Sequence, residues 1–427
     1  MDKRRRIVVI GGGFAGLNFL KRIDKKKYAV TLVDSNNYHS FPPLFYQIAS
    51  SGLEPDSICF PFRRELHRGK AHGAEFHLGR VEWIDVAARK VKTQFETIGY
   101  DILVIAAGTT NNFFGNAELK KTVFTLKSTA QAMRCRYEIL DRLERASICR
   151  DREERCKLLS FTVVGGGPAG VEIAGAIGEM KRYILHRNYP SIPPEDVTIS
   201  LIEGTGSLLG TMSEKCQSDA LKYLQELMVD VRFNLLVRDY KDNIVTLSDG
   251  TSFYSGMVVW TAGIAGMQLD IRNAELKPAR GRRIPVDRFN HIIGLGDDVY
   301  ALGDIALMVT PDYPDGHPQL AQVAIQQGRT LARNLNSDKG LREFSYRDKG
   351  TMATIGRNRA VADIRNIHLR GFIAWLAWMF VHLISILGMR NKLNVLIDWT
   401  WNYFSYGTSL RLLLYPSRYP LKKQDEK

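Results

Sequence analysis

The sequence of 427 residues is poor in cysteine, with five in all. No two of them form a CxxC pair and their spacing follows no regular framework, which argues against disulfide stapling and suits a reducing compartment. The histidines supply no ligand motif either. His67, His72 and His77 recur at intervals of five in an expected loop, and His368 and His382 are far apart. The sequence therefore predicts no metal site.

An apolar run long enough to cross a bilayer is also missing. The longest run, residues 372–388, would extend about 25 Å as a helix, against a hydrocarbon core of about 30 Å. His382 lies inside it, and a spanning helix tolerates such a residue poorly without a partner. The first strand-like run begins at Ile7 and leaves no room for a signal peptide, so we expect a cytoplasmic protein.

Acidic residues are outnumbered, with 45 Asp and Glu against 59 Lys and Arg, a net charge of +14. From Lys349 to the end, twelve basic residues face four acidic ones, and aromatic residues are interleaved with them. Cations and amphipathic rings both find partners at a lipid headgroup boundary. We therefore expect residues 365–420 to lie as an anchor in a membrane surface, with a spanning helix and a buried core or dimer helix as alternatives. Because the positive charge accompanies hydrophobic residues, we expect no nucleic-acid partner.

What the sequence does contain is one glycine fingerprint twice. Residues 11–16 read Gly-Gly-Gly-Phe-Ala-Gly after an apolar run, and residues 165–170 read Gly-Gly-Gly-Pro-Ala-Gly after another. Such glycines permit a tight strand-to-helix turn, close approach to a pyrophosphate and close helix packing. The candidate positions are Gly11, Gly13 and Gly16 in the first copy and Gly165, Gly167 and Gly170 in the second. Two copies predict two bound dinucleotides and electron transfer between them.

Each fingerprint is followed by an acid at the end of a strand-like run, where a carboxylate can bind the hydroxyls of an adenosine ribose. The first acid is Asp34, and the second is Glu203, which lies farther along than usual because residues 187–194 form an inserted loop. A carboxylate at Glu203 repels a 2′-phosphate, so we expect NADH rather than NADPH as the donor. The alternative is that either acid is a solvated strand end.

The two halves share further features. The apolar strand of residues 100–109 ends in Ala-Ala-Gly at Gly108, and the corresponding strand in the second half ends in Thr-Ala-Gly at Gly263. A later strand runs into Asp304, at the carboxyl end of a sheet where ligands bind. We also predict one charged helix over residues 128–155 and an irregular segment over residues 37–47.

This combination resembles the flavoproteins with two dinucleotide-binding domains. The resemblance implies an α/β fold with two Rossmann-like domains, FAD at the first fingerprint and NADH at the second, and contact of Asp304 with the FAD ribityl chain. Disulfide reductases of this superfamily need a cysteine pair near the flavin, where this chain has Cys59 alone. Sulfide:quinone oxidoreductases need a late cysteine, and no cysteine follows Cys216.

Residues 321–328, Ala-Gln-Val-Ala-Ile-Gln-Gln-Gly, point to one branch. Gln322 and Gln326 lie four residues apart on one helix face, and neutral amides can hydrogen-bond a carbonyl without the desolvation cost of a charge. This AQxAxQ pattern, with residues 41–47 and 346–356 and the Trp-rich tail, resembles the type II (non-proton-pumping) NADH:quinone oxidoreductases of respiratory chains.

That resemblance implies a relay of two electrons from NADH through FAD to a membrane quinone, ubiquinone or menaquinone. It implies that Gln322 and Gln326 line the quinone pocket, that Ala324 adjoins the flavin, that Lys349 neutralises the reduced flavin, and that Glu172 positions nicotinamide or delivers protons. It also implies a homodimer attached peripherally to the cytoplasmic face of the inner (plasma) membrane. The alternatives are a reductase of a small electron-carrier protein, such as a ferredoxin or rubredoxin reductase, and a non-catalytic redox sensor.

The expected division of the chain follows the same resemblance. Residues 1–120 form the first part of the FAD-binding domain and residues 121–280 the NADH-binding domain. Residues 281–345 complete the FAD-binding domain, and residues 346–427 form a C-terminal amphipathic region with the quinone site and the membrane anchor.

Overall fold

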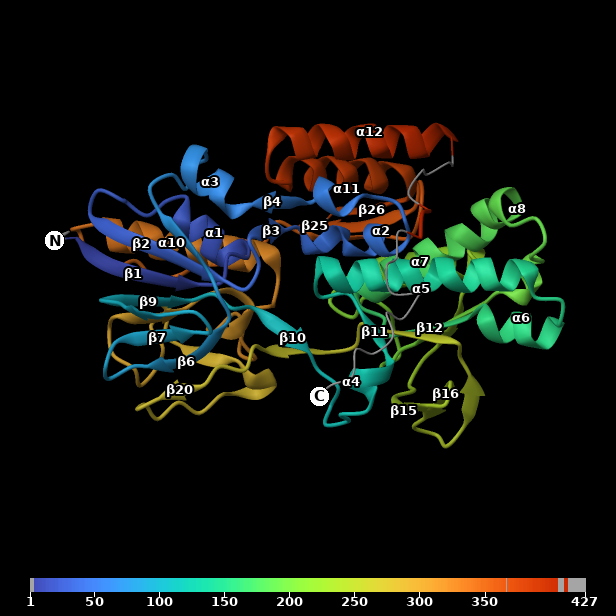
Figure 1. The fold of residues 1–427 in the computed structure, drawn as a ribbon, viewed down its shortest axis with the longest axis horizontal. Helices are drawn as coiled ribbons and strands as arrows, with labels where there is room; N and C mark the ends of the chain where they lie inside the picture. The colour runs from blue at the N-terminus through green and yellow to red at the C-terminus, as the bar shows by residue number, and fades with distance from the viewer. Residues whose placement is uncertain (1–3, 366, 406–410, 414–427) are drawn as a thin grey trace, which may run out of the picture. The chain divides into compact units, whose positions relative to one another are not determined.

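The computed structural model describes residues 4–365, 367–405 and 411–413, and the chain divides into two compact units. The first unit comprises residues 1–40, 59–112 and 264–349, and the second comprises residues 41–58, 113–263 and 350–427. Each unit contains a five-stranded parallel sheet with helices packed on it (Figure 1), which confirms the predicted α/β fold with two Rossmann-like sheets.

The sheet of the first unit has the strand order β22-β9-β1-β2-β5, and every neighbouring pair is parallel. Strands covered on both faces read as continuous apolar runs, and residues 7–10 of β1 are all buried. The bounds are β1 Arg5–Ile10, β2 Tyr28–Asp34, β5 Glu75–Leu78, β9 Ile102–Ile105 and β22 Val299–Ala301.

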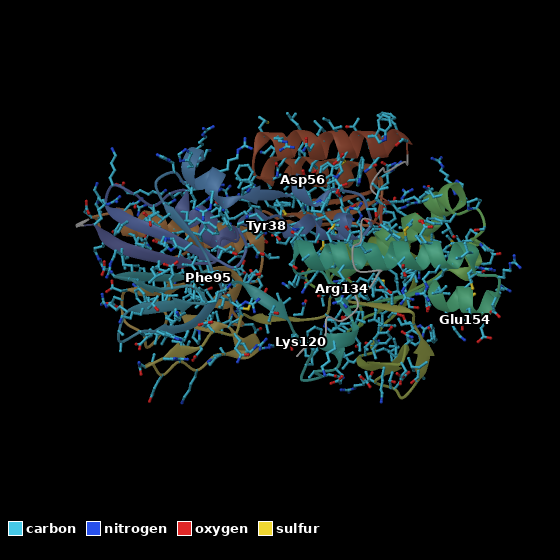
Figure 2. All side chains as sticks on the ribbon, viewed as in Figure 1. Tyr38, Asp56, Phe95, Lys120, Arg134 and Glu154 are labelled. Carbon is cyan, nitrogen blue, oxygen red and sulfur yellow. The ribbon has the colours of Figure 1, made fainter. Side chains whose placement is uncertain are left out.

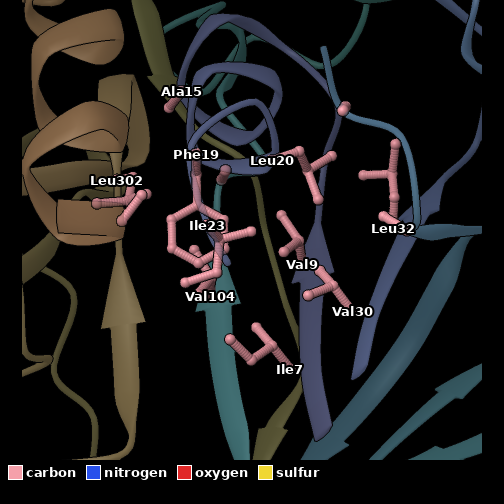
Figure 3. Packing of buried hydrophobic residues seen from close by; sticks show 14 of the residues in the cluster. Ile7, Val9, Ala15, Phe19, Leu20, Ile23, Val30, Leu32, Val104 and Leu302 are labelled. Carbon is pink, nitrogen blue, oxygen red and sulfur yellow. The ribbon is translucent and has the colours of Figure 1, made fainter. Parts of the chain in front are cut away.

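Two helices of the first unit pack closely on each other, α1 (Phe14–Leu20) and α10 (Ala321–Asn336). A Cβ on Gly328 would lie 2.3 Å from the carbonyl oxygen of Ala15, so this approach requires glycine in α10. Beneath them, Phe19 and Leu20 of α1 meet Val9, Leu32 and Val104 of the sheet (Figure 3). The cluster fixes the carboxyl end of β1 and the start of α1, where the first glycine fingerprint lies.

The remaining elements of the first unit are short. The strands are β3 Tyr38–Ser40, β4 Cys59–Pro61, β6 Val81–Asp85, β7 Lys90–Thr93, β8 Thr97–Gly99, β10 Thr109–Asn111, β19 Ile264–Gly266, β20 Ile271–Arg272, β21 Ile284–Val286 and β23 Ala306–Met308. The helical segments are α3 Phe62–Arg68, η5 Arg280–Arg282 and η6 Gly303–Ile305.

The sheet of the second unit repeats the plan, with the strand order β11-β18-β12-β13-β14 and parallel pairing throughout. Its strands are β11 Phe124–Thr125, β12 Ser160–Val164, β13 Thr198–Ile202, β14 Asp230–Arg232 and β18 Met257–Trp260, and a separate antiparallel sheet has β15 Val237–Lys241, β16 Ile244–Leu247 and β17 Ser252–Tyr254. Its helical segments up to residue 226 are η1 Pro42–Leu44, α2 Phe45–Ala49, η2 Pro55–Ser57, α4 Leu119–Thr122, α5 Thr129–Ile148, α6 Arg152–Leu158, α7 Pro168–Glu179, η3 Met180–Ile184, α8 Leu185–Asn188, η4 Pro194–Asp196 and α9 Glu214–Glu226.

The C-terminal part of the second unit is an antiparallel sheet followed by two helices. The sheet has the order β24-β25-β26, with bounds Thr351–Thr354, Ala360–Ile364 and Ile367–Arg370. The helices α11 (Gly371–Ser385) and α12 (Met389–Ser405) lie side by side (Figure 1). Within the described residues, no helix combines the length and the apolar character that crossing a bilayer needs. Residue 366, residues 406–410 and residues from 414 onward, which belong to the expected anchor, lie outside the described residues.

The single helix predicted over residues 128–155 is wrong, because the structure has two helices there. Helix α5 ends at Ile148, and α6 starts afresh at Arg152. The side chain of Asp151 accepts a hydrogen bond from the backbone N–H of Glu154 at 2.9 Å, which caps α6. Figure 2 shows Glu154 on this second helix. An N-cap residue in the middle of a charged run stops one helix and starts another.

Two predicted irregular segments contain regular structure. Residues 37–47 were expected to be irregular, yet they include the strand β3, the turn η1 that starts at Pro42, and the start of α2. Proline at the first position of a helical turn is favourable, since its missing N–H would be unpaired there anyway. The expected inserted loop over residues 187–194 similarly begins inside α8 and ends at η4.

Candidate functional site

The first glycine fingerprint forms a turn that only glycine fits at two positions. Gly11 has φ of +97°, and a Cβ there would lie 2.4 Å from the carbonyl oxygen of Ala106. A Cβ on Gly16 would lie 2.0 Å from the carbonyl oxygen of Gly11. Gly13 is different, because a Cβ on it would meet no protein atom within 4 Å. The turn is therefore tight on its protein side and open at Gly13, as a pyrophosphate cradle at a helix start requires.

The acid at the end of β2 is bonded to this turn. One Asp34 carboxylate oxygen accepts a hydrogen bond from the N–H of Gly12 at 2.7 Å, and the other accepts one from the N–H of Asn36 at 2.8 Å. Burial raises the pKa of Asp34, and these hydrogen bonds oppose the rise. The carboxylate is thus held at the open end of the turn, where a ribose would bind.

A buried histidine supports the same turn from below. His39 Nδ1 lies 2.9 Å from the carbonyl oxygen of Gly12, to which it donates, and burial lowers the pKa of His39 to about 4. The His39 ring is therefore neutral near pH 7, with its proton on Nδ1. Nothing in the sequence spacing links His39 to residue 12, so this contact could not be predicted from the sequence.

The other candidates of the first unit gather where β22 meets α10. Gly303 has φ of +72°, and its N–H donates to Oε1 of the buried Gln327 at 2.7 Å. A Cβ on Gly303 would lie 3.2 Å from the Cβ of Ala324, so this alanine leaves room for the turn. Asp304 follows in η6, and its carbonyl oxygen accepts a hydrogen bond from Gln319 at 2.8 Å. The small side chain of Ala324 therefore lets α10 pack closely against the turn at Gly303, which precedes Asp304.

Gly108 follows β9 at the same end of the first sheet. It has φ of +68°, and a Cβ on it would meet no protein atom within 4 Å. This open backbone repeats the property of Gly13. Both positions leave a surface that a flat or extended ligand can approach closely.

Gln322 and Gln326 do not point into open space but hold a neighbouring segment of the first unit. Gln322 Oε1 accepts a hydrogen bond from the N–H of Lys349 at 3.0 Å. Gln326 accepts from the N–H of Arg347 at 3.0 Å and donates to its carbonyl oxygen at 2.9 Å. The shared helix face that the sequence predicts is therefore used, and its first effect is to fix the backbone of residues 347–349. The side chain of Lys349 is exposed.

The second glycine fingerprint repeats the geometry of the first within the second unit. Gly165 has φ of +104°, and a Cβ there would lie 2.8 Å from the backbone nitrogen of Ala262. A Cβ on Gly170 would lie 1.8 Å from the carbonyl oxygen of Gly165, whereas one on Gly167 would meet nothing within 4 Å. The sequence repeat is thus a repeat of backbone shape, including one open glycine at the start of α7.

Glu203 is placed at this second turn as Asp34 is at the first. Its Oε2 accepts a hydrogen bond from the N–H of Gly166 at 2.5 Å, and its Oε1 accepts from the N–H and the hydroxyl of Thr205, each at 2.8 Å. Gly263, after β18, has φ of +74° and corresponds in position to Gly108. The interval between Gly165 and Glu203 therefore does not displace the acid from the turn.

Glu172 lies in α7, two residues after Gly170, and its side chain is buried. Burial raises the pKa of Glu172 well above its usual value, and a hydrogen bond from the backbone of Thr354 opposes this only in part. Glu179, about two turns farther along the same face of α7, accepts a hydrogen bond from the backbone N–H of Arg357, and burial raises its pKa as well. Two carboxyl groups with raised pKa values therefore line one side of α7.

A partly open cavity of about 160 Å³ lies beside Glu179 in the second unit. Its walls are mainly aromatic and amide side chains, with Glu179 among them: Tyr46, Gln47, Trp375, Trp378, Trp399 and Tyr403. Gln47 donates to the Tyr46 hydroxyl at 2.8 Å and accepts from Trp399 Nε1 at 2.8 Å. Trp378 differs, because its buried Nε1 has no hydrogen-bond partner among the described residues. A donor without a partner is therefore buried in the wall of this cavity.

The structure assembles the sequence-predicted candidates into one set in each unit. The first unit holds Gly11, Gly13, Gly16, Asp34, Gly108, Asp304, Gln322, Ala324, Gln326 and Lys349, and the second holds Glu172, Gly165, Gly167, Gly170, Glu203 and Gly263. The sequence analysis missed Gln327 and Trp378. The small residues Ala324 and Gly328, four apart in α10, are a signal of close packing that could have drawn attention to Gln327 between them.

Comparisons with known proteins agree with this arrangement. Residues 5–328 match the family model of pyridine nucleotide-disulphide oxidoreductases, and residues 349–405 match the NDH2 C-terminal domain. A type II NADH:quinone oxidoreductase of Mycobacterium tuberculosis is 34% identical over 426 residues, which cover 94% of this chain and 89% of that protein. An external NADH-ubiquinone oxidoreductase of Saccharomyces cerevisiae mitochondria is 27% identical, with coverages of 94% and 81%.

Among solved structures, NDH2 of Plasmodium falciparum in complex with NADH superposes with a TM-score of 0.89 and 22% identity, covering 96% of this chain and 100% of that one. The sulfide:quinone oxidoreductase of Aquifex aeolicus has a TM-score of 0.72 at 18% identity, with coverages of 94% and 96%. At these identities the superpositions show that the fold is shared.

Proposed function

Since the chain belongs to the family of pyridine nucleotide-disulphide oxidoreductases and carries an NDH2 C-terminal domain, we propose that it transfers two electrons from NADH through FAD to a quinone without pumping protons. The observation that carries this function is the duplicated glycine turn, with an acid bonded to its second glycine in each unit. Two dinucleotide cradles in one chain suit electron transfer between two nucleotide cofactors.

The first cradle holds FAD in this proposal. Its residues fit FAD. Gly13 and Gly108 leave the backbone open to a ligand, and the Asp34 carboxylate lies where it can accept hydrogen bonds from the ribose hydroxyls. When bound, FAD supplies the redox chemistry, taking a hydride from NADH and passing electrons to the quinone. Asp304 binds the ribityl chain, and Ala324 keeps the space for the turn before it.

The second cradle holds NADH, with Gly165, Gly167 and Gly170 around the pyrophosphate and Glu203 on the adenosine ribose. A carboxylate fixed by three hydrogen bonds repels the 2′-phosphate of NADPH, because like charges at close range disfavour each other. The chain therefore prefers NADH. Gly263, which has φ of +74°, adjoins the cofactor in this cradle.

The quinone head group enters the cavity that Trp378 and Tyr46 line. Its volume of about 160 Å³ is of the order that holds one six-membered ring, as cavities of about 150 Å³ hold benzene. Trp378 Nε1 is buried in the cavity wall without a hydrogen-bond partner among the described residues, and a shift of the indole ring would bring this donor to a quinone carbonyl. Reduction of the quinone consumes two protons. Glu179 lines this cavity, and burial raises the pKa of Glu179 and of Glu172 on the same helix.

Lys349, Gln322 and Gln326 act together in the first unit. The two amides fix residues 347–349 by backbone hydrogen bonds, and the exposed ammonium of Lys349 supplies a positive charge where the flavin gains a negative one. In this role the glutamines orient the cation, and they do not line the cavity proposed for the quinone, which lies within the second unit.

Attachment to a membrane surface is the proposed task of α11 and α12. Both helices expose large apolar side chains at helical spacing: Phe372, Ile373, Leu376, Phe380, Ile384, Leu393, Ile397, Trp401 and Phe404. Such a pair of helices suits insertion among lipid headgroups. We place the protein at the cytoplasmic face of the inner (plasma) membrane as a homodimer. The four-part division of the chain, with the FAD-binding domain in residues 1–120 and 281–345, belongs to the same proposal.

Anaerobic spectroscopy of the purified protein in detergent tests this function. NADH is added and the flavin absorbance followed, and a ubiquinone or menaquinone analogue is added afterwards. We expect rapid bleaching and then rapid reoxidation by the quinone. Bleaching without reoxidation would favour a protein acceptor such as a ferredoxin or rubredoxin, and slow bleaching with a long-lived charge-transfer band would favour a redox sensor.

A further inference from the structure

The second unit contains a group of chemically reactive side chains that the proposed electron transfer does not use. Cys216, Asp363 and His368 each offer one ligand atom, and these three atoms all lie within 4.8 Å of one another. Cys216 is buried, and the other two side chains are half-buried. Cys216 and His368 are 152 residues apart, so their spacing matches no metal-binding motif. For this reason the sequence alone predicts no metal site.

Regular structure brings the three side chains together. Asp363 on β25 and His368 on β26 are cross-strand partners in an antiparallel pair. Helix α9 packs on both strands, and Ser213 caps its start by accepting a hydrogen bond from the N–H of Cys216. The thiol therefore projects from the first helical turn onto the pair of strands. None of these side chains depends on a loop for its position.

The distances match those that a tetrahedral metal ion requires. Cys216 Sγ lies 3.2 Å from His368 Nδ1, and that nitrogen lies 3.6 Å from Asp363 Oδ1. Zinc bonds of about 2.3 Å to sulfur and about 2.0–2.1 Å to nitrogen and oxygen put sulfur and nitrogen about 3.5 Å apart, and nitrogen and oxygen about 3.3 Å apart. An ion fits among the three atoms after shifts of a few tenths of an ångström.

The second ring nitrogen of His368, Nε2, already has a hydrogen-bond partner. His368 Nε2 lies 3.0 Å from Asp219 Oδ2, so it donates its proton there and leaves Nδ1 with a lone pair toward the thiol. Asp219 lies one turn after Cys216 on α9, and its other oxygen accepts a hydrogen bond from Arg370 at 3.1 Å. A carboxylate on the second nitrogen is what metal-ligating histidines generally have.

We propose that Cys216, Asp363 and His368 bind one zinc ion, with water as the fourth ligand and Asp219 as the residue that orients His368. A thiolate, an imidazole and a carboxylate together favour zinc over magnesium or calcium. The thiol gives up its proton to solvent when the sulfur–zinc bond forms. An open hollow of about 390 Å³, lined by Asp219, His368 and Arg370 among others, lies beside the histidine of the site.

The ion would fasten α9 to the hairpin of β25 and β26, which runs directly into α11 at Gly371. Without metal the same groups bond to one another and to Ser213, whose N–H and hydroxyl donate to Asp363 at 2.7 and 2.8 Å. These hydrogen bonds hold the carboxylate in place beside the other two ligand atoms, and an ion bound there would stabilise the folded chain.

Metal binding is tested on the full FAD-loaded chain after treatment with a chelator. Cobalt(II) is titrated in, since tetrahedral thiolate cobalt has ligand-field bands at longer wavelengths than the oxidised flavin. We expect one equivalent of cobalt with these bands, and their displacement by one equivalent of zinc. Absence of the bands, or binding without a fixed stoichiometry, would overturn the proposal.

Variants separate this site from surface binding. Cys216→Ser should abolish the cobalt bands, and Cys156→Ser, at a half-buried cysteine on α6, should leave them unchanged. Asp219→Asn should weaken zinc binding by about 10–100-fold while keeping the three ligands. Flavin content checks that each variant is folded, and His368→Gln replaces Cys216→Ser if the latter does not fold. Equal cobalt binding by the wild type and a folded ligand variant would contradict the proposal, whatever the NADH:quinone activity.

Discussion

The carboxylate of Glu203 accepts a hydrogen bond from the backbone N–H of Gly166, with 2.5 Å between oxygen and nitrogen. The equivalent bond of the first unit joins Asp34 to Gly12 at 2.7 Å. An acid held by the turn itself cannot swing away from a ligand that lies on the turn. We therefore expect the charge at residue 203 to influence which dinucleotide the second unit accepts.

Replacing that charge should relax the preference for NADH. Glu203→Gln keeps an oxygen for the N–H of Gly166 and removes the negative charge. We expect the ratio of kcat/KM for NADH to that for NADPH to fall about tenfold, which corresponds to the loss of about 1.4 kcal/mol of repulsion. Steady-state kinetics with both nucleotides measure the ratio. An unchanged ratio would show that another group excludes the 2′-phosphate.

The open glycine of the first turn should be needed for FAD and not for folding. A Cβ at Gly13 meets no protein atom within 4 Å, so Gly13→Ala disturbs only a ligand that approaches the backbone there. We expect a folded protein with low flavin content, measured by absorbance against protein concentration. Gly210→Ala is the matched control, because that position is equally open and should leave the flavin content unchanged. Full flavin content in Gly13→Ala would contradict the assigned cradle.

Buried Glu172 should make stability depend on pH. Burial raises its pKa in the folded chain above the unfolded value, so between the two pKa values the folded state binds the extra proton and stability falls as pH rises. Glu172→Gln cannot ionise. The free energy of unfolding of this variant relative to wild type should therefore increase with pH above about 4.3, by up to about 1.4 kcal/mol per pH unit. Denaturant unfolding at several pH values checks this, and parallel curves would contradict it.

Trp378 should contribute to quinone reduction through its indole N–H. Trp378→Phe retains most of the ring and removes the donor that has no partner in the cavity. We expect the KM for quinone to rise about tenfold, in keeping with about 1–1.5 kcal/mol for one hydrogen bond, while NADH bleaches the flavin at the normal rate. Trp401→Phe, at an exposed position of α12, is the control. Equal quinone kinetics in the two variants would remove Trp378 from the site.

Gln322 should matter for the second half-reaction. Gln322→Leu removes the acceptor for the N–H of Lys349 and so loosens the segment that carries the ammonium group. We expect slow reoxidation by quinone with bleaching by NADH intact, measured by stopped-flow absorbance. Loss of both steps would instead indicate a general disturbance of the flavin site.

The features that the sequence predicts best are those set by a few adjacent residues. The turns at Gly11 and Gly165 appear in the sequence as short local motifs, although the atoms that exclude a side chain at these two glycines belong to Ala106 and Ala262, far along the chain. The break between α5 and α6 is also local, because Asp151 is a typical N-cap residue. The residues around it are charged and favour helix, so the composition alone predicts one continuous helix.

The features that escaped prediction are assembled from distant parts of the chain. The cavity beside Trp378 takes side chains from α2, α7, α11 and α12, and no periodicity relates residue 46 to residue 399. The group around Cys216 depends on the packing of α9 against a hairpin that is more than a hundred residues away. In both cases the residue types are common ones, and only tertiary packing brings them close enough to form a site.

In the proposed attachment of α11 and α12 to a membrane surface, the substrate concentration that this enzyme meets is the concentration within the membrane. A quinone dissolves in the lipid phase, so a chain seated on that surface meets it at a density per unit area, set by the mole fraction of quinone among the lipids. Adding empty vesicles at constant total quinone dilutes the substrate without changing its amount per volume of sample. Rates for such a chain should therefore be compared at equal mole fractions of quinone in the lipid. A small total amount of quinone in the sample can then saturate the site.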